Sequence, residues 1–427
     1  MKKPAIGIIH YSAPPVLGSV EAVIEKMCRM FSDNGYRTTL IVARGGRKYR
    51  SGFYDIKRIK EINSQFSINQ NINERLEKGR DVSDVFSEYS DRIFKKLDRV
   101  LGRIDICLMH NVLVKDLNFP LAAAIHRLAD KYAGSKTFVN WVHDASYMDY
   151  RQPYWYDRKD EFPYKFVTKH NTNIVNVAVS PKRQADVSEM YNIPEKEVAV
   201  IPNGIDIPKL VGMEKGTEII WEANNLYEQD AVIFIPARIV HKKNIELGIR
   251  LTEEMNRLGV LTKLVVSGRP SRHMGRRESY YTKIKELIAA HNLEDVVIFL
   301  HEYRDRQGRK INVSDKMIRD LYIMSDVLLF ASYEEGFGLP VLEASVFKTP
   351  IICSKIPPLT DFAGYEILYI NPKGKPRRMA KKVIDFLSDY HGFRFRRNIF
   401  RKYRWDSIFR KHIEPFILRI DKDRKKV

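Results

Sequence analysis

Cysteine is scarce in this sequence, with three residues among 427: Cys28, Cys107 and Cys353. They lie far apart, are odd in number and lack the close spacing of a zinc site. The sequence therefore excludes a disulfide framework and predicts reduced core thiols in a cytoplasmic protein. Long apolar runs are also missing, because none approaches the ~20 residues needed to span a bilayer. The apolar stretch after residues 1–4 is too short for a signal peptide, so neither an integral membrane protein nor a secreted precursor is expected.

Acidic residues are too few to balance the basic ones, with 53 Asp and Glu against 73 Lys and Arg and a formal net charge of +20. This balance predicts an anionic partner. Residues 373–404 hold twelve of the cations and two acids, Asp385 and Asp389. Such a run is usually a solvated helical face. The alternative is that it makes peripheral contact with the inner face of an anionic membrane. Nucleic acid is not expected as a partner.

The chain is too long for one ordinary core, since domains usually hold roughly 100–200 residues. Short apolar strands alternate with amphipathic stretches such as residues 82–101, which is typical of doubly wound α/β domains with parallel sheets. The expected strands are residues 5–10, 38–43, 105–110, 137–142 and 173–180, then 231–236, 263–267, 296–300, 326–331 and 349–353. Two prolines and an Asn-Gly pair at residues 201–208 mark a connector. We therefore expect Rossmann-like domains at residues 1–203 and 204–404, with a helical segment at residues 405–427 packing on the first.

Ligands of open α/β sheets bind outside the carboxyl ends of the strands, so the residues that follow the strands are the candidate site. Gly18 precedes a predicted helix in the loop after the first strand, and His143 follows the strand at 137–142. Arg238 and Lys243 follow the strand at 231–236 and suit a diphosphate, while Gly268 follows the next strand. Each of these has an ordinary structural alternative, such as a loop glycine, a structural histidine or a solvated basic loop.

The strongest segment runs from Ser332 to Glu343, after the strand at 326–331. Gly336 and Gly338 open the backbone between a strand and a helix, where amide N–H groups can hold phosphate. Glu335 and Glu343 supply carboxylates, which accept hydrogen bonds from the hydroxyls of a sugar or a ribose.

At these residues the sequence resembles the family 4 glycosyltransferases, which are retaining enzymes of the GT-B fold. The two-glutamate motif, Glu335 to Glu343 with seven residues between, is the most specific element. The segment at 200–206 is similar to the interdomain segment of the family, and Arg238 and Lys243 match its diphosphate pair in spacing. The resemblance implies two Rossmann-like domains facing across a cleft, a C-terminal helix crossing back to the N-terminal domain, a nucleotide-sugar donor and no metal or other cofactor.

The resemblance also implies roles for individual residues. Glu335 and His143 would contact the transferred sugar, and Arg238 and Lys243 would stabilise the departing diphosphate. The backbone of Gly336, Phe337, Gly338 and Leu339 would contact phosphate, Glu343 would hold the ribose, and Gly18, Gly268 and Tyr303 would line the donor site. Ser19, His301 and Lys348 stand where the family often has glycine.

The function predicted from the sequence is transfer of a hexose, glucose or mannose, from a donor such as UDP-glucose or GDP-mannose to a hydroxyl of a sugar, polyol or lipid-linked glycan. One alternative is a sugar-nucleotide isomerase or hydrolase on the same scaffold. Another is a non-catalytic protein that binds membrane or polyanion through residues 373–404. The sequence does not specify the donor base, the acceptor, the linkage or the oligomeric state.

Overall fold

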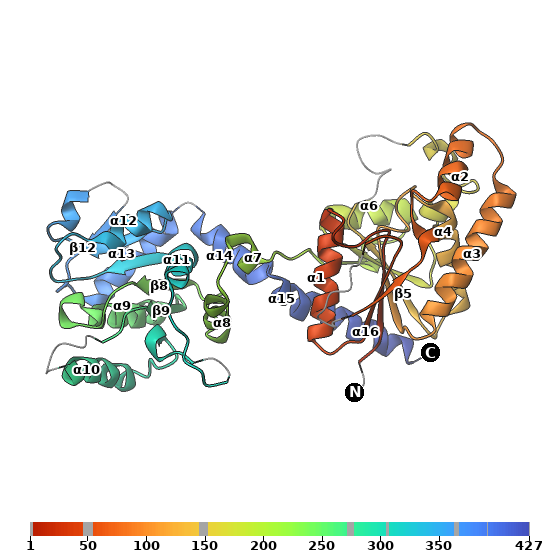
Figure 1. The fold of residues 1–427 in the computed structure, drawn as a ribbon. Helices are drawn as coiled ribbons and strands as arrows, with labels where there is room; N and C mark the ends of the chain where they lie inside the picture. The colour runs from red at the N-terminus through yellow and green to blue at the C-terminus, as the bar shows by residue number, and fades with distance from the viewer. Residues whose placement is uncertain are drawn as a thin grey trace. The chain divides into compact units, whose positions relative to one another are not determined.

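The computed structural model describes residues 3–45, 54–144, 153–270, 277–304, 307–362, 367–390 and 392–426. The chain divides into two compact units, the first holding Met1–Ile205 with Trp405–Val427 and the second holding Asp206–Arg404. The observed boundary lies two residues after the expected one. Each unit is built on a parallel sheet flanked by helices (Figure 1).

The first unit has a sheet of seven parallel strands in the order β3-β2-β1-β4-β5-β6-β7. Its strands are β1 (Ile6–Ile9), β2 (Thr38–Val42), β3 (Asp55–Arg58), β4 (Ile106–His110), β5 (Thr137–Val142), β6 (Ile174–Ala178) and β7 (Val198–Val200). Its helices are α1 (Ser19–Asp33), α2 (Ser67–Glu77), α3 (Ser83–Leu101), α4 (Phe119–Lys131), α5 (Lys165–Thr168), α6 (Pro181–Tyr191), α15 (Trp405–Ile408) and α16 (Glu414–Arg424).

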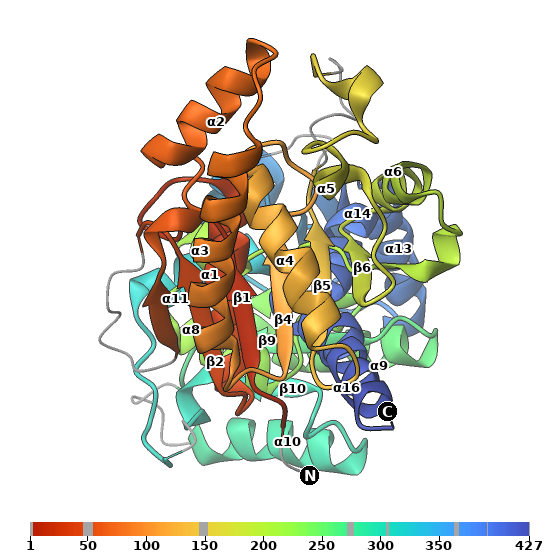
Figure 2. The ribbon, with the colours of Figure 1, turned by 90° about the vertical axis from the view of Figure 1, so that its right-hand side faces the viewer.

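Both faces of this sheet are buried, because successive strand residues point to opposite faces. On one face Ile6 and Ile8 pack with α1 and with the C-terminal segment, where Phe409 and Ile417 are buried. On the other face Ile9 packs with the cluster formed by α2, α3 and α4, and Figure 2 shows α3 and α4 in front of the sheet. The C-terminal segment therefore completes the core of the first unit.

The second unit has six parallel strands in the order β10-β9-β8-β11-β12-β13. Its strands are β8 (Ala231–Ile235), β9 (Thr262–Val266), β10 (Val297–Phe299), β11 (Val327–Phe330), β12 (Ile351–Ser354) and β13 (Ile367–Ile370). Its helices are α7 (Ile207–Val211), α8 (Lys215–Ala223), α9 (Ile245–Arg257), α10 (Arg277–Ala290), α11 (Asp315–Met324), α12 (Leu339–Val346), α13 (Pro376–Asp389) and α14 (Phe393–Lys402). The predicted fold class, two doubly wound parallel α/β sheets, is confirmed, as are all ten predicted strands.

Part of the basic run at residues 373–404 is structural. Arg397 is 3% exposed, and its Nε donates to Asp326 Oδ1 at 2.8 Å while its Nη1 donates to the carbonyl of Leu226 at 3.0 Å. Asp326 also accepts from the amide of Val232 at 2.7 Å, at the start of β8. Burial lowers the pKa of Arg397 to about 9. The expectation of a solvated helical face is therefore wrong for this arginine, which ties α14 to the sheet.

The three cysteines are buried and unbonded, and burial raises the pKa of Cys107 and of Cys353 to about 12. Over the described ranges, no helix combines the length and apolarity required to cross a bilayer.

Candidate functional site

In the second unit, the loops after β8 and β9 touch each other through their backbones. Ile239 donates its amide to the carbonyl of Arg269 at 3.2 Å, and Ser267 donates to Ile235 at 3.2 Å. A Cβ added to Gly268 would lie 2.0 Å from the carbonyl oxygen of Ala237. Gly268 is thus required where the two loops meet, and this packing supports the loop that carries Arg238.

Lys243 and Glu335 form an ion pair between the loops after β8 and β11. The Lys243 side chain is 15% exposed and the Glu335 side chain 11%. The ammonium also lies 4.7 Å from the centre of the Phe330 ring, a cation–π contact that favours the charged lysine. Two groups that the sequence assigned separately, one to diphosphate and one to sugar, are therefore direct partners.

Arg238 differs from Lys243 in its surroundings. Its side chain is exposed, and among the described residues its guanidinium has no partner. An arginine without a carboxylate partner has its N–H donors available for an anionic ligand.

The backbone between β11 and α12 turns sharply at Gly338, whose φ is 102° and ψ 38°. This left-handed conformation suits glycine, so Gly338 is required at the helix start. A Cβ on Gly336 would meet nothing within 4 Å, so the loop is open there. Phe337 and Leu339 are 52% and 59% exposed. The segment thus presents backbone amides of a helix start at an accessible place, where an anion is favoured.

A backbone hydrogen bond fixes this loop to the loop after β8, since Tyr333 donates its amide to the carbonyl of Lys242 at 2.9 Å. The rings of Tyr333 and His241 stack with their centres 5.6 Å apart. The two loops that carry Lys243 and Glu335 are therefore joined at several points.

Glu343 lies on α12 with an exposed side chain. The hydroxyl of Tyr322 donates to Glu343 Oε2 at 2.6 Å. Burial, and then this hydrogen bond, raise the pKa of Tyr322, so the hydroxyl stays protonated and acts as a donor. Sequence reasoning missed Tyr322 because it lies on α11, 21 residues away, and only the fold brings it to Glu343.

Tyr303 follows β10 and a short 3₁₀ turn, Leu300–Glu302. Its amide donates to the carbonyl of Leu300 at 3.2 Å, and its carbonyl accepts from Ile311 at 3.1 Å. These bonds fix the backbone of the loop at the carboxyl end of β10, the edge of the sheet that also carries Arg238, Gly268 and Glu335.

In the first unit, Gly18 lies immediately before α1 in extended backbone, with φ 179° and ψ 151°. A Cβ there would lie 1.9 Å from the carboxylate of Glu21. Glu21 accepts a hydrogen bond from the hydroxyl of Ser12 at 2.6 Å. Hydrogen bonding from His10, and then from Ser12, lowers the pKa of Glu21 to about 2. A larger residue at this position would meet only the end of the flexible Glu21 side chain, so the contact places an ionised carboxylate beside Gly18 without requiring glycine there.

His143 follows β5 and belongs to a line of three histidines, with His110 and His10. Its Nε2 lies 2.8 Å from Nδ1 of His110, and its amide donates to Asn111 Oδ1 at 2.8 Å. Its Nδ1 lies 3.5 Å from Nδ2 of Asn203. Burial, and then the nearby His10, lower the pKa of His143 to about 4, so its ring is neutral near pH 7.

His10 and His110 are the residues of this line that sequence reasoning missed. His10 Nδ1 lies 2.8 Å from the carbonyl oxygen of His110, and burial lowers the pKa of His110 well below its ordinary value. The available signal was positional, because His10 follows β1 and His110 ends β4. The strand order places β1, β4 and β5 side by side, so these histidines meet at one edge.

Two groups of predicted residues thus lie at the carboxyl ends of strands, one in each unit. The second unit gathers cations, carboxylates and helix-start amides, which is the set of groups that binds a diphosphate joined to a hydroxylated ligand. The first unit places Gly18 and His143 after β1 and β5. Across the described part of the chain, no group of three or more His, Cys, Asp or Glu side chains is positioned to hold a metal ion.

Known proteins that this chain resembles include glycosyltransferases. The chain is 26% identical over 259 residues to an uncharacterised glycosyltransferase of Methanocaldococcus jannaschii, covering 56% of this chain and 59% of that protein. It is 25% identical over 255 residues to the O-antigen chain mannosyltransferase RfbU of Salmonella typhimurium, covering 58% and 61%. The mannosylglucosylglycerate synthase of Thermotoga maritima is 22% identical over 369 residues, covering 81% and 79%. The chain thus spans about three fifths of the first two relatives.

A solved glycosyltransferase from Rickettsia africae ESF-5 aligns over 100% of this chain and 99% of its own, at 18% identity and a TM-score of 0.38. The family model of glycosyl transferases group 1 matches residues 217–404, which contain Arg238, Lys243, Gly268 and both glutamates of the motif. Residues 217–404 therefore match the glycosyl transferases group 1 family, and the resemblance predicted from the sequence is confirmed there.

Proposed function

We propose that the chain is a retaining glycosyltransferase that moves a hexose from a nucleoside diphosphate sugar to a hydroxyl acceptor without a metal ion. The observation that carries the proposal is the contact of Lys243 with Glu335, together with the guanidinium of Arg238, which lies in the same loop as Lys243 and has no partner among the described residues. In a nucleoside diphosphate sugar, an anionic phosphate is bonded directly to a hydroxylated sugar. A lysine that binds phosphate next to a glutamate that binds hydroxyls matches this arrangement.

In this proposal the donor diphosphate displaces Glu335 from Lys243. Arg238 and Lys243 then hold phosphate oxygens, and the backbone amides of residues 337–339 hold others. Glu335, released from the lysine, accepts hydrogen bonds from the sugar hydroxyls. Glu343 holds the ribose, and the Tyr322 hydroxyl fixes one carboxylate oxygen of Glu343.

Cleavage breaks the bond between the anomeric carbon and the diphosphate oxygen, and negative charge develops on the leaving group. Fixed cations stabilise that charge in the transition state, an effect typically worth about 3–4 kcal/mol for one group. The acceptor hydroxyl attacks from the same face, and its proton passes to the departing diphosphate oxygen. No protein nucleophile is required.

His143 and Gly18 have separate roles in the proposal. Gly18 lies under the phosphate or acceptor at the start of α1, where the ligand has to displace the Glu21 carboxylate from the adjacent space, and His143 contacts the transferred sugar. Because the pKa of His143 is lowered to about 4, the neutral ring offers a hydrogen bond rather than a positive charge.

Two relatives are named for mannosyl transfer or a mannosylated product, so GDP-mannose is the first donor to test and UDP-glucose the second. The proposed acceptor is a sugar, a polyol or a lipid-linked glycan. A thermal-shift panel of nucleotide sugars tests donor binding. At 100 times its dissociation constant a ligand stabilises the folded protein by about 2.7 kcal/mol, which raises the melting temperature by roughly 5–10 °C.

The anomeric configuration of the product tests the retaining mechanism. With an α-linked donor and a soluble acceptor, NMR of the first-formed product should show an α linkage. A β linkage would contradict same-face attack. Failure of every nucleotide sugar to raise the melting temperature would contradict the donor assignment itself.

A further inference from the structure

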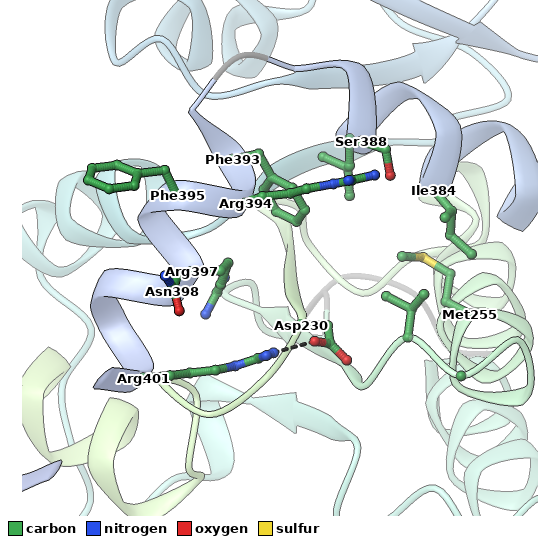
Figure 3. Close-up of a pocket in the computed structure, with 13 residues that line it drawn as sticks. Asp230, Met255, Ile384, Ser388, Phe393, Arg394, Phe395, Arg397, Asn398 and Arg401 are labelled. Atoms are coloured by element: carbon green, nitrogen blue, oxygen red, sulfur yellow. Dashed lines mark hydrogen bonds and ion pairs between the residues drawn. The ribbon is translucent and has the colours of Figure 1, made fainter. Parts of the chain in front are cut away.

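A pocket of about 630 Å³ lies in the second unit at the amino ends of its strands (Figure 3). Asp230, which lines it, directly precedes β8, and Val260 precedes β9. The loops with Arg238, Gly268 and Glu335 follow the carboxyl ends of β8, β9 and β11. The pocket is therefore at the opposite edge of the sheet from the proposed donor site and has no role in the function above.

The lining of the pocket is divided between apolar side chains and polar ones, which include three arginines. Ile384 and Leu387 of α13, Met255 of α9 and Phe393 of α14 form apolar parts of the wall. Arg394 extends from α14 toward Ser388 of α13 (Figure 3). Its side chain is exposed and has no partner within the part of the chain that the structure describes.

Other charges at the pocket are neutralised within the unit. Arg401 pairs with Asp230, and Arg397 pairs with Asp326. Arg394 is thus the rim arginine whose charge is not matched by a neighbouring carboxylate.

Further cations extend this rim along α13. Arg377 and Lys381 precede Ile384 and Ser388 at helical spacings of three and four residues, so all four share one face of α13. Eight of the twelve basic residues at 373–404 are exposed: Lys373, Lys375, Arg377, Arg378, Lys381, Lys382, Arg394 and Lys402. The acids of this segment, Asp385 and Asp389, leave most of that charge uncompensated.

Exposed aromatic side chains accompany these cations. Phe395 is 70% exposed on α14, and Tyr390 and Tyr403 are 37% and 38% exposed at the ends of α13 and α14. Phe395 is among the residues that line the pocket, and Figure 3 shows its ring pointing in the opposite direction from the Arg394 side chain. An exposed Phe contributes nothing to binding a small anion in water, whereas cations flanked by aromatic side chains are typical of surfaces that contact a lipid interface.

We propose that the exposed surface of α13 and α14 docks on an anionic phospholipid bilayer. Arg394, Arg377 and Lys381 contact lipid phosphates, Phe395 inserts at the acyl boundary, and the pocket beside Arg394 accepts part of a lipid. Charge complementarity favours this occupant, because each cation near an anionic leaflet strengthens partitioning by about fivefold. The inference does not depend on the donor or acceptor of the proposed reaction.

The test is sedimentation of the full chain with vesicles, without nucleotide sugar. One vesicle set contains phosphatidylcholine with phosphatidylglycerol and the other contains phosphatidylcholine alone. The variant Arg394→Ala/Phe395→Ala removes the central cation and aromatic side chain. The matched control Arg103→Ala/Leu210→Ala removes an exposed arginine and an apolar side chain that is 73% exposed, both outside α13 and α14. Melting temperatures verify that both variants fold.

The chain should pellet with the anionic vesicles, be released by high salt, and stay in solution with phosphatidylcholine alone. The arginine should account for about a fivefold loss of partitioning and the phenylalanine for about tenfold or more. The control should bind as the parent does. Absence of pelleting, equal pelleting with both vesicle sets, or equal losses in variant and control would each overturn the inference. A rise in melting temperature with inorganic phosphate that Arg394→Ala abolishes, without vesicle binding, would also overturn it and indicate a free-anion site.

Discussion

Replacing Glu335 and replacing Lys243 should change the binding of the product, a nucleoside diphosphate, in opposite directions. A nucleoside diphosphate without its sugar offers phosphate to Lys243 but no hexose hydroxyls to Glu335. Glu335 then only competes for the lysine and repels the diphosphate. Replacing Glu335 by Gln should therefore strengthen binding of the free nucleoside diphosphate, although the same change should greatly slow transfer.

The size of the effect follows from the geometry. Two unit charges about 4 Å apart interact by about 1 kcal/mol in water and about 4 kcal/mol at an effective dielectric constant near 20. The side chains are 15% and 11% exposed, so the pair lies between these limits. A value of about 2 kcal/mol corresponds to roughly 30-fold tighter binding of the diphosphate. Lys243→Met should instead weaken that binding by a comparable factor, and each variant should lower the transfer rate by about 100-fold or more.

Isothermal titration with GDP and UDP measures the binding, and a transfer assay with the best donor measures the rate. The neighbouring pair Lys242 and Glu334 provides a matched control, since its charges are 3.9 Å apart and its side chains are 49% and 75% exposed. Glu334→Gln and Lys242→Met should change both quantities by less than about threefold, because exposed pairs contribute roughly 0–1 kcal/mol.

The reasoning fails if Glu335→Gln binds the diphosphate more weakly than the parent while its melting temperature is unchanged. It also fails if Glu334→Gln strengthens binding as much as Glu335→Gln does. Near-normal transfer by both Glu335→Gln and Lys243→Met would reject these two residues as part of the site.

Other parts of the chain give three further predictions. Lys348 has a φ of 56°, so Lys348→Gly should relieve left-handed strain and raise the melting temperature of the second unit by roughly 2 °C in calorimetry; a decrease would contradict this. Arg397→Met should destabilise that unit by about 3–5 kcal/mol in denaturant because Asp326 stays buried without its partner, and adding Asp326→Asn should recover part of the loss. The pKa of His143 is about 4 in the fold against an ordinary 6.5. The unfolded chain therefore binds the proton first as pH falls, and the first unit should lose about 3 kcal/mol between pH 7 and pH 4, a loss that His143→Gln reduces.

The sequence predicts ten of the thirteen strands that the structure describes and misses three strands at the lateral edges of the sheets. Most of the ten predicted strands are continuous apolar runs, which is what burial on both faces of a parallel sheet requires. The missed strands β3, β7 and β13 are edge strands of three or four residues. In β3, the sequence Asp-Ile-Lys-Arg has three exposed residues out of four, so no apolar pattern marks it. Its pairing with β2 arises from the fold rather than from local sequence.

The candidate site is predictable in part for a similar reason. Residues directly after a strand, such as Arg238, His143 and Glu335, are found by position along the chain, because parallel strands end at one edge. Contacts between separate loops cannot be found by position along the chain. The pairing of Lys243 with Glu335, for example, joins residues 92 positions apart. The hydrogen bond from Tyr322 to Glu343 likewise needs α11 and α12 to be adjacent, which no spacing in the sequence specifies.

The line of histidines limits what His143 can contribute to transfer. Nε2 of His143 is engaged with His110 at 2.8 Å, whereas its Nδ1 is held loosely, 3.5 Å from the Asn203 amide. The nitrogen that can exchange its partner for a sugar hydroxyl is therefore Nδ1. Because burial lowers the pKa of His143 to about 4, the ring carries no positive charge near pH 7 to offset charge on the leaving group. In the proposed reaction that task therefore falls to Arg238 and Lys243, and the role proposed for His143 reduces to one neutral hydrogen bond to the sugar.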